Sequence, residues 1–359
     1  MRTWQLQHSG DLRVAVLGAT GYSGMEVLRY LYHHPHVTVN YVGAGTSAGQ
    51  PIGSALPAFF GIYSEDIEPI DLQRIAEKAD VAILCLPSGK SAAVAQALLQ
   101  LGVRVIDVGG DLRLGAYDAY LHYYGKEAPL TQEAYEALIG ARTFGLSEYA
   151  KEALRTAELV ADPGCYPTAA LLALLPLVEA GLVQPGGVII DAASGVTGSG
   201  AKPTPATHYV TVDENYAPYK VGQHQHQPEI EEQLQRYGDV GKVTFVTHLL
   251  PAQRGILETI HVALRMPVSA RELRSLYDRA YADAPFVRLL PEDVWPNLRA
   301  VAGTNLCDLN FTVDAQLQRA TLFVSIDNLG KGAAGQAVQN LNLMYGFDEA
   351  CGLTFLPSV

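Results

Sequence analysis

The chain has 359 residues, of which 48% are hydrophobic and 17% are charged, and this balance excludes an intrinsically disordered protein. At about 150 residues per domain, the length predicts two domains. The formal net charge of −12 argues against a nucleic acid or an anionic membrane as partner, because their phosphates would be repelled. Any anionic substrate must therefore meet a local basic group.

The N-terminal stretch MRTWQLQHSGDLRVAVLG lacks the basic, apolar and cleavage-site regions of a signal peptide. The most apolar stretch follows Thr168 and is interrupted by Pro176 and Glu179, short of the ~20 residues that a membrane helix needs. The four cysteines lie far apart and form no CxxC pair, which predicts neither a disulfide framework nor a zinc site. They are Cys85, Cys165, Cys307 and Cys351. We expect a cytoplasmic protein.

The first 150 residues predict a sheet in which strands alternate with helices. LRVAVLG is typical of a buried strand, and a glycine turn and a helix with apolar residues at 27, 28 and 31 follow it. VTVNYVGAG, ADVAILCLPS and VRVIDVGGD predict further strands, and a glycine-terminated helix is expected between Ser91 and Gly102. This alternation predicts a doubly wound parallel α/β sheet.

From Gly186 onward the pattern changes to strands joined by long loops rich in glycine, serine and proline. KVTFVTHLLPAQRGILETIHVALRM is strongly β-rich and predicts an α+β domain on a mostly antiparallel sheet. DNLGKGAAGQAVQNLNLMYGF, near the C-terminus, predicts a glycine-rich turn that leads into a helix. The second half is therefore a different kind of domain from the first.

Gly18, Gly21 and Gly24 form a G-x-x-G-x-x-G turn between the first expected strand and its helix. Backbone N–H groups at the start of that helix could bind a pyrophosphate, which indicates a dinucleotide site. A tight turn that needs small residues only for packing would give the same pattern. The position between a strand and a helix favours the nucleotide.

The residues after this turn bear on which nicotinamide cofactor would bind. NAD usually requires a carboxylate some 20 residues on to bind the ribose hydroxyls, and none lies between Glu26 and Glu65. Thr46 and Ser47 offer hydroxyls that could bind a 2′-phosphate without repelling it. NADP is therefore favoured over NAD, although no lysine or arginine lies within residues 30–73 to bind that phosphate.

Cys165 stands in PGCYPTAALLALL, between a Pro-Gly turn and a helix that we expect to begin near Thr168. A helix N-terminus stabilises an anion, so a thiolate would form more easily there. The alternative is a small buried hydrophobic residue, the commoner role of an intracellular cysteine, and Cys85 in VAILCLP fits that role.

The segment GQHQHQPEIEE could supply the proton partner that a reactive thiol needs. It contains His224 and His226, with Glu229 close behind. A metal site on the H-x-H pair is one alternative, for which no third ligand is apparent, and a solvated polar loop is another.

Together these stretches resemble the N-acetyl-γ-glutamyl-phosphate reductases of arginine biosynthesis, within the wider semialdehyde dehydrogenase group. The resemblance runs from Gly18 to Phe347. It rests on GATGYSG, PGCYPTAALLAL, SGVTGSGAKPTPATHYV, YKVGQHQHQPEIE, HLLPAQRGIL and DNLGKGAAGQAVQNLNLMYGF. It implies NADPH-dependent reduction of the acyl phosphate to the semialdehyde through a cysteine thioester, with release of phosphate.

The resemblance also implies an architecture and a set of catalytic residues. A Rossmann-type NADP-binding domain over residues 1–163 and 329–359 would be joined to a glyceraldehyde-phosphate-dehydrogenase-like catalytic domain over residues 164–328. Such proteins usually form homodimers or homotetramers. Cys165 would be the nucleophile and His224 its acid or base, with His226 and Glu229 as supporting polar groups.

Further residues are assigned to the cofactor and the substrate by the same match. These reductases commonly have an arginine between the two histidines, where this chain has Gln225, so Arg113 and Arg254 remain to hold a phosphate or carboxylate. For either arginine the alternative is a surface ion pair. Ser194 and Gly195 join them as substrate-binding candidates. The cofactor-binding candidates are Gly18, Thr20, Gly21, Tyr22, Ser23, Gly24, Thr46, Ser47, Pro87, Ser88 and Asn328.

Three other functions stay open on the sequence alone. A reductase of lysine biosynthesis would use the same chemistry on an aminoadipoyl phosphate borne by a carrier protein. Aspartate-semialdehyde dehydrogenase is more distant, since its cysteine and histidine segments differ. A non-catalytic NADP-binding regulator would keep the fold without turnover, but the retained thiol and acid–base residues argue against it.

Overall fold

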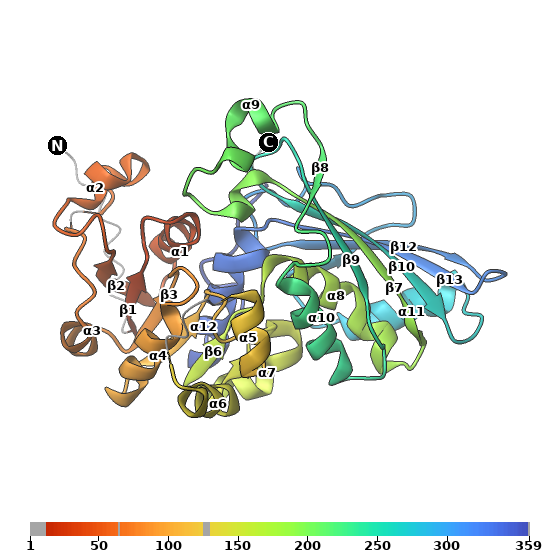
Figure 1. Cartoon of the computed structure of the whole chain (residues 1–359), viewed down its shortest axis with the longest axis horizontal. Coiled ribbons are helices and arrows are strands. Elements are labelled where there is room, and N and C mark those ends of the chain that lie inside the picture. The colour runs from red at the N-terminus through yellow and green to blue at the C-terminus, as the bar shows by residue number, and fades with distance from the viewer. Residues whose placement is uncertain (1–11, 64, 125–129, 358–359) are drawn as a thin grey trace. The chain divides into compact units, whose positions relative to one another are not determined.

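The structure is a computed structural model that describes residues 12–63, 65–124 and 130–357. The chain divides into two compact units, which are described separately and can be followed by colour in Figure 1. The first unit comprises Met1–Asp162 and Ala334–Thr354, and the second comprises Pro163–Ala333 and Phe355–Val359. The division at 333/334 lies five residues beyond the expected limit, and the last residues fall in the second unit.

A six-stranded sheet with the order β2-β1-β3-β4-β6-β5 forms the centre of the first unit, and every pairing in it is parallel. The prediction of a parallel doubly wound sheet is confirmed. The strand order reverses between β1 and β3, where open α/β sheets bind their ligands. The strands are β1 (Leu12–Leu17), β2 (Val37–Gly43), β3 (Val81–Leu84), β4 (Arg104–Asp107), β5 (Thr143–Phe144) and β6 (Leu159–Ala161).

Helices of the first unit pack against this sheet or against each other, and α1 (Tyr22–Tyr32) buries one apolar side. In the first of them Val27, Leu28 and Leu31 are buried, as their spacing predicts. The helices are α1 (Tyr22–Tyr32), α2 (Ile52–Ala55), α3 (Leu72–Lys78), α4 (Ser91–Gln100), α5 (Tyr117–Tyr123), α6 (Gln132–Ala141), α7 (Ser147–Thr156) and α12 (Gly335–Tyr345), with a 3₁₀ turn at Pro57–Phe59.

Helix α12 belongs to the first unit although it comes from the far end of the chain, and it contacts α1, α7 and β4. Its buried amides need partners. Asn340 donates to Asp162 Oδ1 at 2.9 Å and accepts from the Ser147 hydroxyl at 2.7 Å, while Gln336 donates to the carbonyl of Gly145 at 2.8 Å. Asp162 thus acts as an acceptor for α12.

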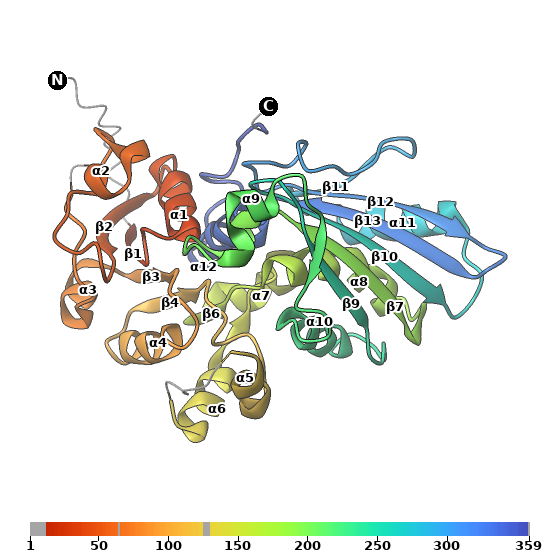
Figure 2. The same cartoon turned by 45° about the horizontal axis from the view of Figure 1, so that its top comes forward.

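A seven-stranded mixed sheet forms the second unit, with the order β11-β12-β13-β10-β7-β9-β8. Only the β11/β12 and β7/β9 pairs are parallel, so the prediction of a mostly antiparallel sheet is confirmed. Figure 2 shows these strands fanning out. They are β7 (Val183–Ser194), β8 (Ala217–Tyr219), β9 (Thr244–Leu249), β10 (Ile256–Leu264), β11 (Val287–Leu289), β12 (Cys307–Asp314) and β13 (Arg319–Ile326).

Helix α8 (Cys165–Glu179) lies on this sheet against β7, β10 and β13, and is itself covered by α10 (His226–Gln235) and α11 (Ala270–Ala280). It is buried on all sides, which matches its uniformly apolar sequence. Shorter elements complete the unit: α9 (Tyr209–Val212), 3₁₀ turns at Val196–Ser199 and Pro205–Thr207, and a π-helical turn at Gly330–Ala334.

Pro176 lies inside α8, where it supplies no N–H to the carbonyl four residues earlier. That carbonyl belongs to Leu172, and the hydroxyl of Tyr281 at the end of α11 donates to it. Tyr277 donates in the same way to the carbonyl of Ala173. Tyr281, directly after α11, therefore satisfies the acceptor that the proline leaves free, and with Tyr277 of α11 it fixes this helix on α8. Among the described residues, no helix is long and apolar enough to cross a membrane.

Candidate active site

Cys165 is the first residue of α8, and Gly164 is the N-cap. The helix therefore begins three residues earlier than we expected from Thr168, because Pro167 fits within a first helical turn. The backbone N–H of Gly164 donates to Glu229 Oε1 at 2.8 Å, and Glu229 is fully buried on α10. The carboxylate thus holds the turn that presents the thiol, while the first N–H groups of α8 lie beside Cys165.

His226 begins α10 and lies directly against the turn that precedes the thiol. A Cβ added to Gly164 would collide with the ring of His226, with Nε2 as its nearest atom. Position 164 therefore has to be glycine for this imidazole to approach. Gly332 closes another side, because a Cβ there would lie 2.8 Å from the Cβ of Cys165. The sequence pointed to this glycine turn, but gave no sign that it touches the thiol.

His224 is buried, with 4% of its surface exposed, inside a set of aromatic rings. Tyr166, Tyr219 and Phe245 surround it edge to face, at centroid distances of 5.5, 5.7 and 5.5 Å. Its Nδ1 accepts the backbone N–H of His226 at 3.2 Å, so in the neutral ring the proton is on Nε2. Burial, with a smaller contribution from the charge of Lys220, lowers the pKa of His224 to about 3. The ring is therefore neutral at physiological pH.

Two tyrosines that sequence reasoning did not single out belong to the same cluster. Their hydroxyls, on Tyr166 and Tyr219, are hydrogen-bonded to each other at 3.0 Å. Burial raises the pKa of both phenols, and the adjacent Cys165 adds to the shift in each case. Both therefore stay protonated, and the one that accepts in the bond between them keeps its own proton to donate to another group. Tyrosines beside a cysteine and a histidine carry no sequence signal of such a role.

The structure brings the expected catalytic set of Cys165, His224, His226 and Glu229 together in the second unit, but distributes their contacts differently from the match. The imidazole against the cysteine turn is that of His226, whereas His224 lies in the aromatic enclosure. Glu229 contacts the backbone of Gly164. Among the described residues, no group of three or more histidine, cysteine, aspartate or glutamate side chains is placed to hold a metal.

Arg254 and Asn328, two further candidates, form structural contacts in the second unit. Arg254 Nε is 2.7 Å from the buried carboxylate of Asp327, which also accepts the backbone N–H groups of residues 303, 329 and 330. The Asn328 amide accepts from Gly255 N at 2.7 Å and donates to the Thr197 hydroxyl at 3.1 Å. Asn328 therefore holds loops together, and its expected contact with the cofactor stays a prediction.

Ser194 and Gly195 lie at the end of β7. The Ser194 hydroxyl donates to its neighbour's carbonyl at 2.9 Å, and a Cβ on Gly195 would collide with the backbone of Arg254. Arg113 lies in the first unit, where its guanidinium donates to the carbonyls of Asp162 at 2.9 Å and Val108 at 2.7 Å. Arg254 is thus ion-paired with a fully buried carboxylate, and Arg113 is almost completely buried.

The glycine turn of the first unit has the geometry of a phosphate-binding turn. Gly18 has φ +81°, and a Cβ there would collide with the carbonyl of Cys85. A Cβ on Gly24 would collide with the carbonyl of Gly18. Helix α1 has Gly21 as its N-cap, with no side-chain cap and no acidic residue in its first turn. Its first N–H groups, including those of Tyr22 and Ser23, can receive a pyrophosphate.

The loops beside this turn come from the neighbouring strands. Thr46 and Ser47 follow β2, and Pro87 and Ser88 follow β3, so they lie at the carboxyl edge where the strand order reverses. Thr20 belongs to the glycine turn itself. In contrast to α1, helix α4 is capped by Asp111, which accepts the N–H groups of Ser91 at 3.0 Å and Ala92 at 3.2 Å. Of these two helix starts, α1 is the one that fits an anion.

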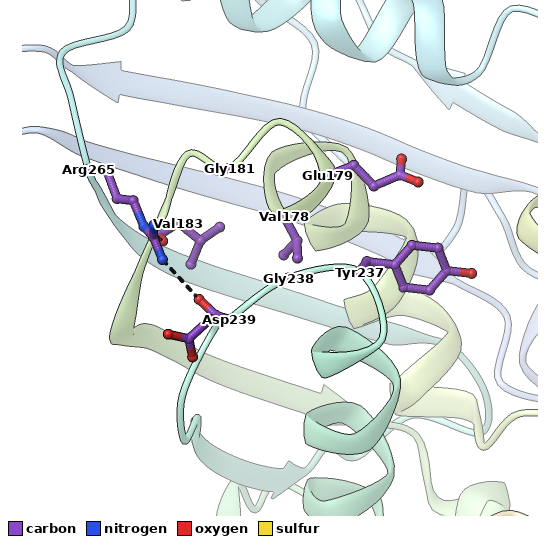
Figure 3. Close-up of a pocket in the computed structure, with 8 residues that line it drawn as sticks. All are labelled: Val178, Glu179, Gly181, Val183, Tyr237, Gly238, Asp239 and Arg265. Carbon is purple, nitrogen blue, oxygen red and sulfur yellow. Dashed lines mark hydrogen bonds between the residues drawn. The ribbon is translucent and has the colours of Figure 1, made fainter.

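A pocket in the described part of the chain lies at the C-terminal end of α8, whereas Cys165 is at the N-terminal end of that helix (Figure 3). It measures about 270 Å³. Arg265 donates from one side of it to the carbonyls of Val183 at 2.7 Å and Asp239 at 3.3 Å. Its lining residues are Val178, Glu179, Gly181, Val183, Tyr237, Gly238, Asp239 and Arg265, none of which was a candidate site residue.

Comparison with known proteins agrees with both units. The family model "Semialdehyde dehydrogenase, NAD binding domain" matches residues 13–157, and "Semialdehyde dehydrogenase, dimerisation domain" matches residues 165–328. An N-acetyl-gamma-glutamyl-phosphate reductase of Shouchella clausii is 42% identical over 346 residues, which cover 96% of this chain and 99% of that one. The chain belongs to the semialdehyde dehydrogenase family. A reductase of the same name from Geobacillus stearothermophilus is 43% identical over 347 residues, 96% of this chain and 99% of that one.

Solved structures of the semialdehyde dehydrogenase family share the fold. Aspartate semialdehyde dehydrogenase II of Vibrio cholerae superposes with a TM-score of 0.70 at 20% identity, over 93% of this chain and 98% of that one. The NADP complex of the Candida albicans aspartate semialdehyde dehydrogenase gives a TM-score of 0.67 at 15% identity, over 93% and 98% of the two chains. The Rossmann-type unit and the mixed-sheet unit are thus the shared architecture of these enzymes.

Proposed function

We propose that the protein reduces N-acetyl-γ-glutamyl phosphate to N-acetylglutamate semialdehyde with release of phosphate, as a step of arginine biosynthesis. The single observation that carries this proposal is the position of Cys165. It begins α8 beside His226, on a turn fixed by Glu229. The relatives that bear this reductase name and cover almost the whole chain support the substrate.

The chemistry requires a thiolate because an acyl phosphate must first become a group that accepts hydride. The Cys165 sulfur attacks the acyl carbonyl and phosphate leaves, which produces a thioester. The nicotinamide cofactor, when bound, supplies the hydride that reduces this thioester. The resulting thiohemiacetal collapses to the aldehyde and returns the electron pair to sulfur. Backbone N–H groups at the start of α8 stabilise the oxyanion, an effect worth roughly 3 to 4 kcal/mol per donor.

The two histidines have different roles in this proposal, with proton transfer carried out by His226. His226 is better placed than His224 for the acid–base role that the resemblance assigned to His224, because its ring touches the cysteine turn. A group whose pKa is about 3 carries no proton to give as an imidazolium at neutral pH. His224 instead offers a fixed Nε2–H donor, and Glu229 keeps the turn in place.

The cofactor is proposed to be NADP, bound at α1 and its flanking loops. The unobstructed helix start fits a pyrophosphate, and Thr46 and Ser47 fit a 2′-phosphate better than a carboxylate would. The dimerisation domain of the matched family supports a homo-oligomer, which we propose to be a homodimer or a homotetramer. Light scattering of the purified protein would distinguish the two.

The deciding experiment runs the reaction backwards, with N-acetylglutamate semialdehyde, inorganic phosphate and either NADP or NAD. We expect phosphate-dependent formation of NADPH, and slower formation of NADH. An aminoadipate semialdehyde on its carrier protein serves as the competing substrate. Binding of NADPH without phosphate-dependent activity on either aldehyde would contradict the proposal.

A further inference from the structure

Lys220 is an unassigned cation in the cluster around the thiol. It follows β8 directly and has φ +47°, the left-handed region that a lysine rarely adopts. Its ammonium donates to Gln225 Oε1 at 2.9 Å. Within the residues that the structure describes, no carboxylate lies within 4 Å of that ammonium. The backbone is thus held in an uncommon conformation that directs a positive charge to the histidine segment.

Among the described residues, Lys220 lacks the carboxylate partner that two other cations of the second unit have. Arg254 is neutralised by Asp327 at 2.7 Å, and Lys242 by Glu231 at 2.6 Å. Partial desolvation lowers the pKa of Lys220, so its charged form gains less from its surroundings than in water. A cation in such a place is stabilised by an anion that arrives with a ligand.

The surroundings of Lys220 belong to the site already described. Its neighbour Tyr219 lies close enough to Cys165 for the sulfur to raise the phenol pKa, and the Lys220 charge acts on His224. Gln225, which orients the ammonium, stands between the two histidines. An anion bound by Lys220 would therefore be part of a molecule that reacts at Cys165.

We propose that Lys220, oriented by Gln225, binds an anionic oxygen of the acyl-phosphate substrate. This inference rests on the proposed function, since it names a contact of the same substrate. The substrate has two such groups, the phosphoryl group and the α-carboxylate. Both present the same chemistry to an ammonium, and the reverse reaction separates them because phosphate and semialdehyde are then independent reactants.

The test is a kinetic comparison of Lys220→Gln with the wild type in the reverse direction. Loss of one charge-assisted contact is expected to raise one KM by about ten- to a hundred-fold, with a much smaller change in kcat. A rise for phosphate assigns Lys220 to the phosphoryl group, and a rise for the semialdehyde assigns it to the carboxylate. Lys242→Gln, which removes an ion-paired surface lysine of the same unit, is the matched control.

A rescue variant keeps the test independent of folding defects. In Lys220→Gln/Gln225→Arg the positive charge is supplied from position 225, whose side-chain oxygen is 2.9 Å from the Lys220 ammonium in the wild type. The KM that Lys220→Gln raises should therefore fall most of the way back to the wild-type value. Gln225→Ala alone should raise the same KM by a few-fold. Unchanged KM values for both reactants in a folded, active Lys220→Gln enzyme would overturn the inference. A wild-type enzyme that is inactive on the semialdehyde would instead contradict the proposed function. Stabilisation of the wild type by inorganic phosphate, abolished in Lys220→Gln, would still support the contact.

Discussion

Helices α1 and α8 both have a glycine as N-cap, and they differ in what surrounds their first turn. Helix α1 starts after Gly21 with no side-chain cap and no acidic residue, so its N–H groups face solvent-borne ligands. Helix α8 starts after Gly164, whose own N–H is held by the buried Glu229 and whose open side is filled by His226. The positive N-terminal end of a helix thus fits the phosphate of an exchangeable ligand at α1, and stabilises a thiolate of the chain itself at α8.

The largest expected effect comes from the thiol itself. Cys165→Ser should lower kcat by about 10³-fold or more, because a hydroxyl at the same helix start is not ionised and is a poor nucleophile. The affinity for NADP, measured by fluorescence titration, should stay unchanged, since that site is at α1. Turnover near the wild-type rate would refute a covalent route through this residue.

Replacing one glycine by alanine at each helix start should affect kcat in one case and cofactor affinity in the other. Gly164→Ala would displace His226 from the cysteine turn and should lower kcat by about 10²-fold with little change in cofactor affinity. In Gly24→Ala the added methyl group would collide with the carbonyl of Gly18, which should weaken cofactor binding with little change in kcat. Gly140→Ala, where an added Cβ meets nothing within 4 Å, is the control. Equal effects of both variants on both quantities would show that the two sites are not separable in this way.

Cofactor choice should respond to charge near α1 only. Thr46→Asp would place a carboxylate where we expect the 2′-phosphate, and should weaken NADP binding by about ten-fold while NAD binding improves. Thr46→Val removes the hydroxyl without adding charge and should cost only a few-fold. If NADP affinity is the same in all three proteins, the 2′-phosphate lies elsewhere.

The smallest expected effect concerns stability against pH. The pKa of His224 is lowered to about 3 in the fold, against 6.5 when unfolded, so folding favours the neutral ring. The contribution of His224 to the free energy of unfolding is fully present above pH 6.5 and is lost as pH falls toward 3. The loss between pH 6.5 and 5 amounts to about 2 kcal/mol. In His224→Phe this part of the acid dependence should disappear in urea unfolding. His261→Phe, at an exposed position of β10, should leave the slope as it is.

Much of the fold follows from local pattern. The buried strand, glycine turn and amphipathic helix around Gly18 are fixed by neighbours in the sequence, and so were predictable with the strand alternation that follows them. The start of α8 was placed three residues late, because the apolar run dominated over the capping geometry at Gly164. The cysteine and histidine segments could be joined only through a family resemblance, since they are separated by some sixty residues of chain.

Contacts that depend on tertiary packing were not predictable. Whether His224 or His226 meets the cysteine turn depends on how α10 lies on α8, and a spacing of two residues cannot decide it. The hydrogen bonds of the Asn328 amide to Gly255 and Thr197 join residues that lie far apart in the sequence, so no local pattern indicates them. Lys220 lies in the matched stretch YKVGQHQHQPEIE, but the sequence does not show that its ammonium is held by Gln225 with no carboxylate of the described residues within 4 Å.

The capture of α12 by the first unit has a consequence for how the protein is made. A ribosome releases residues 163–333 before α12 emerges, so the second unit can mature while the six-stranded sheet still lacks the helix that covers β4 and meets Asp162. The nucleotide-binding unit is complete only after residues 334–354 have emerged. Truncation after residue 333 would therefore damage the unit made first, and leave the one made second largely intact.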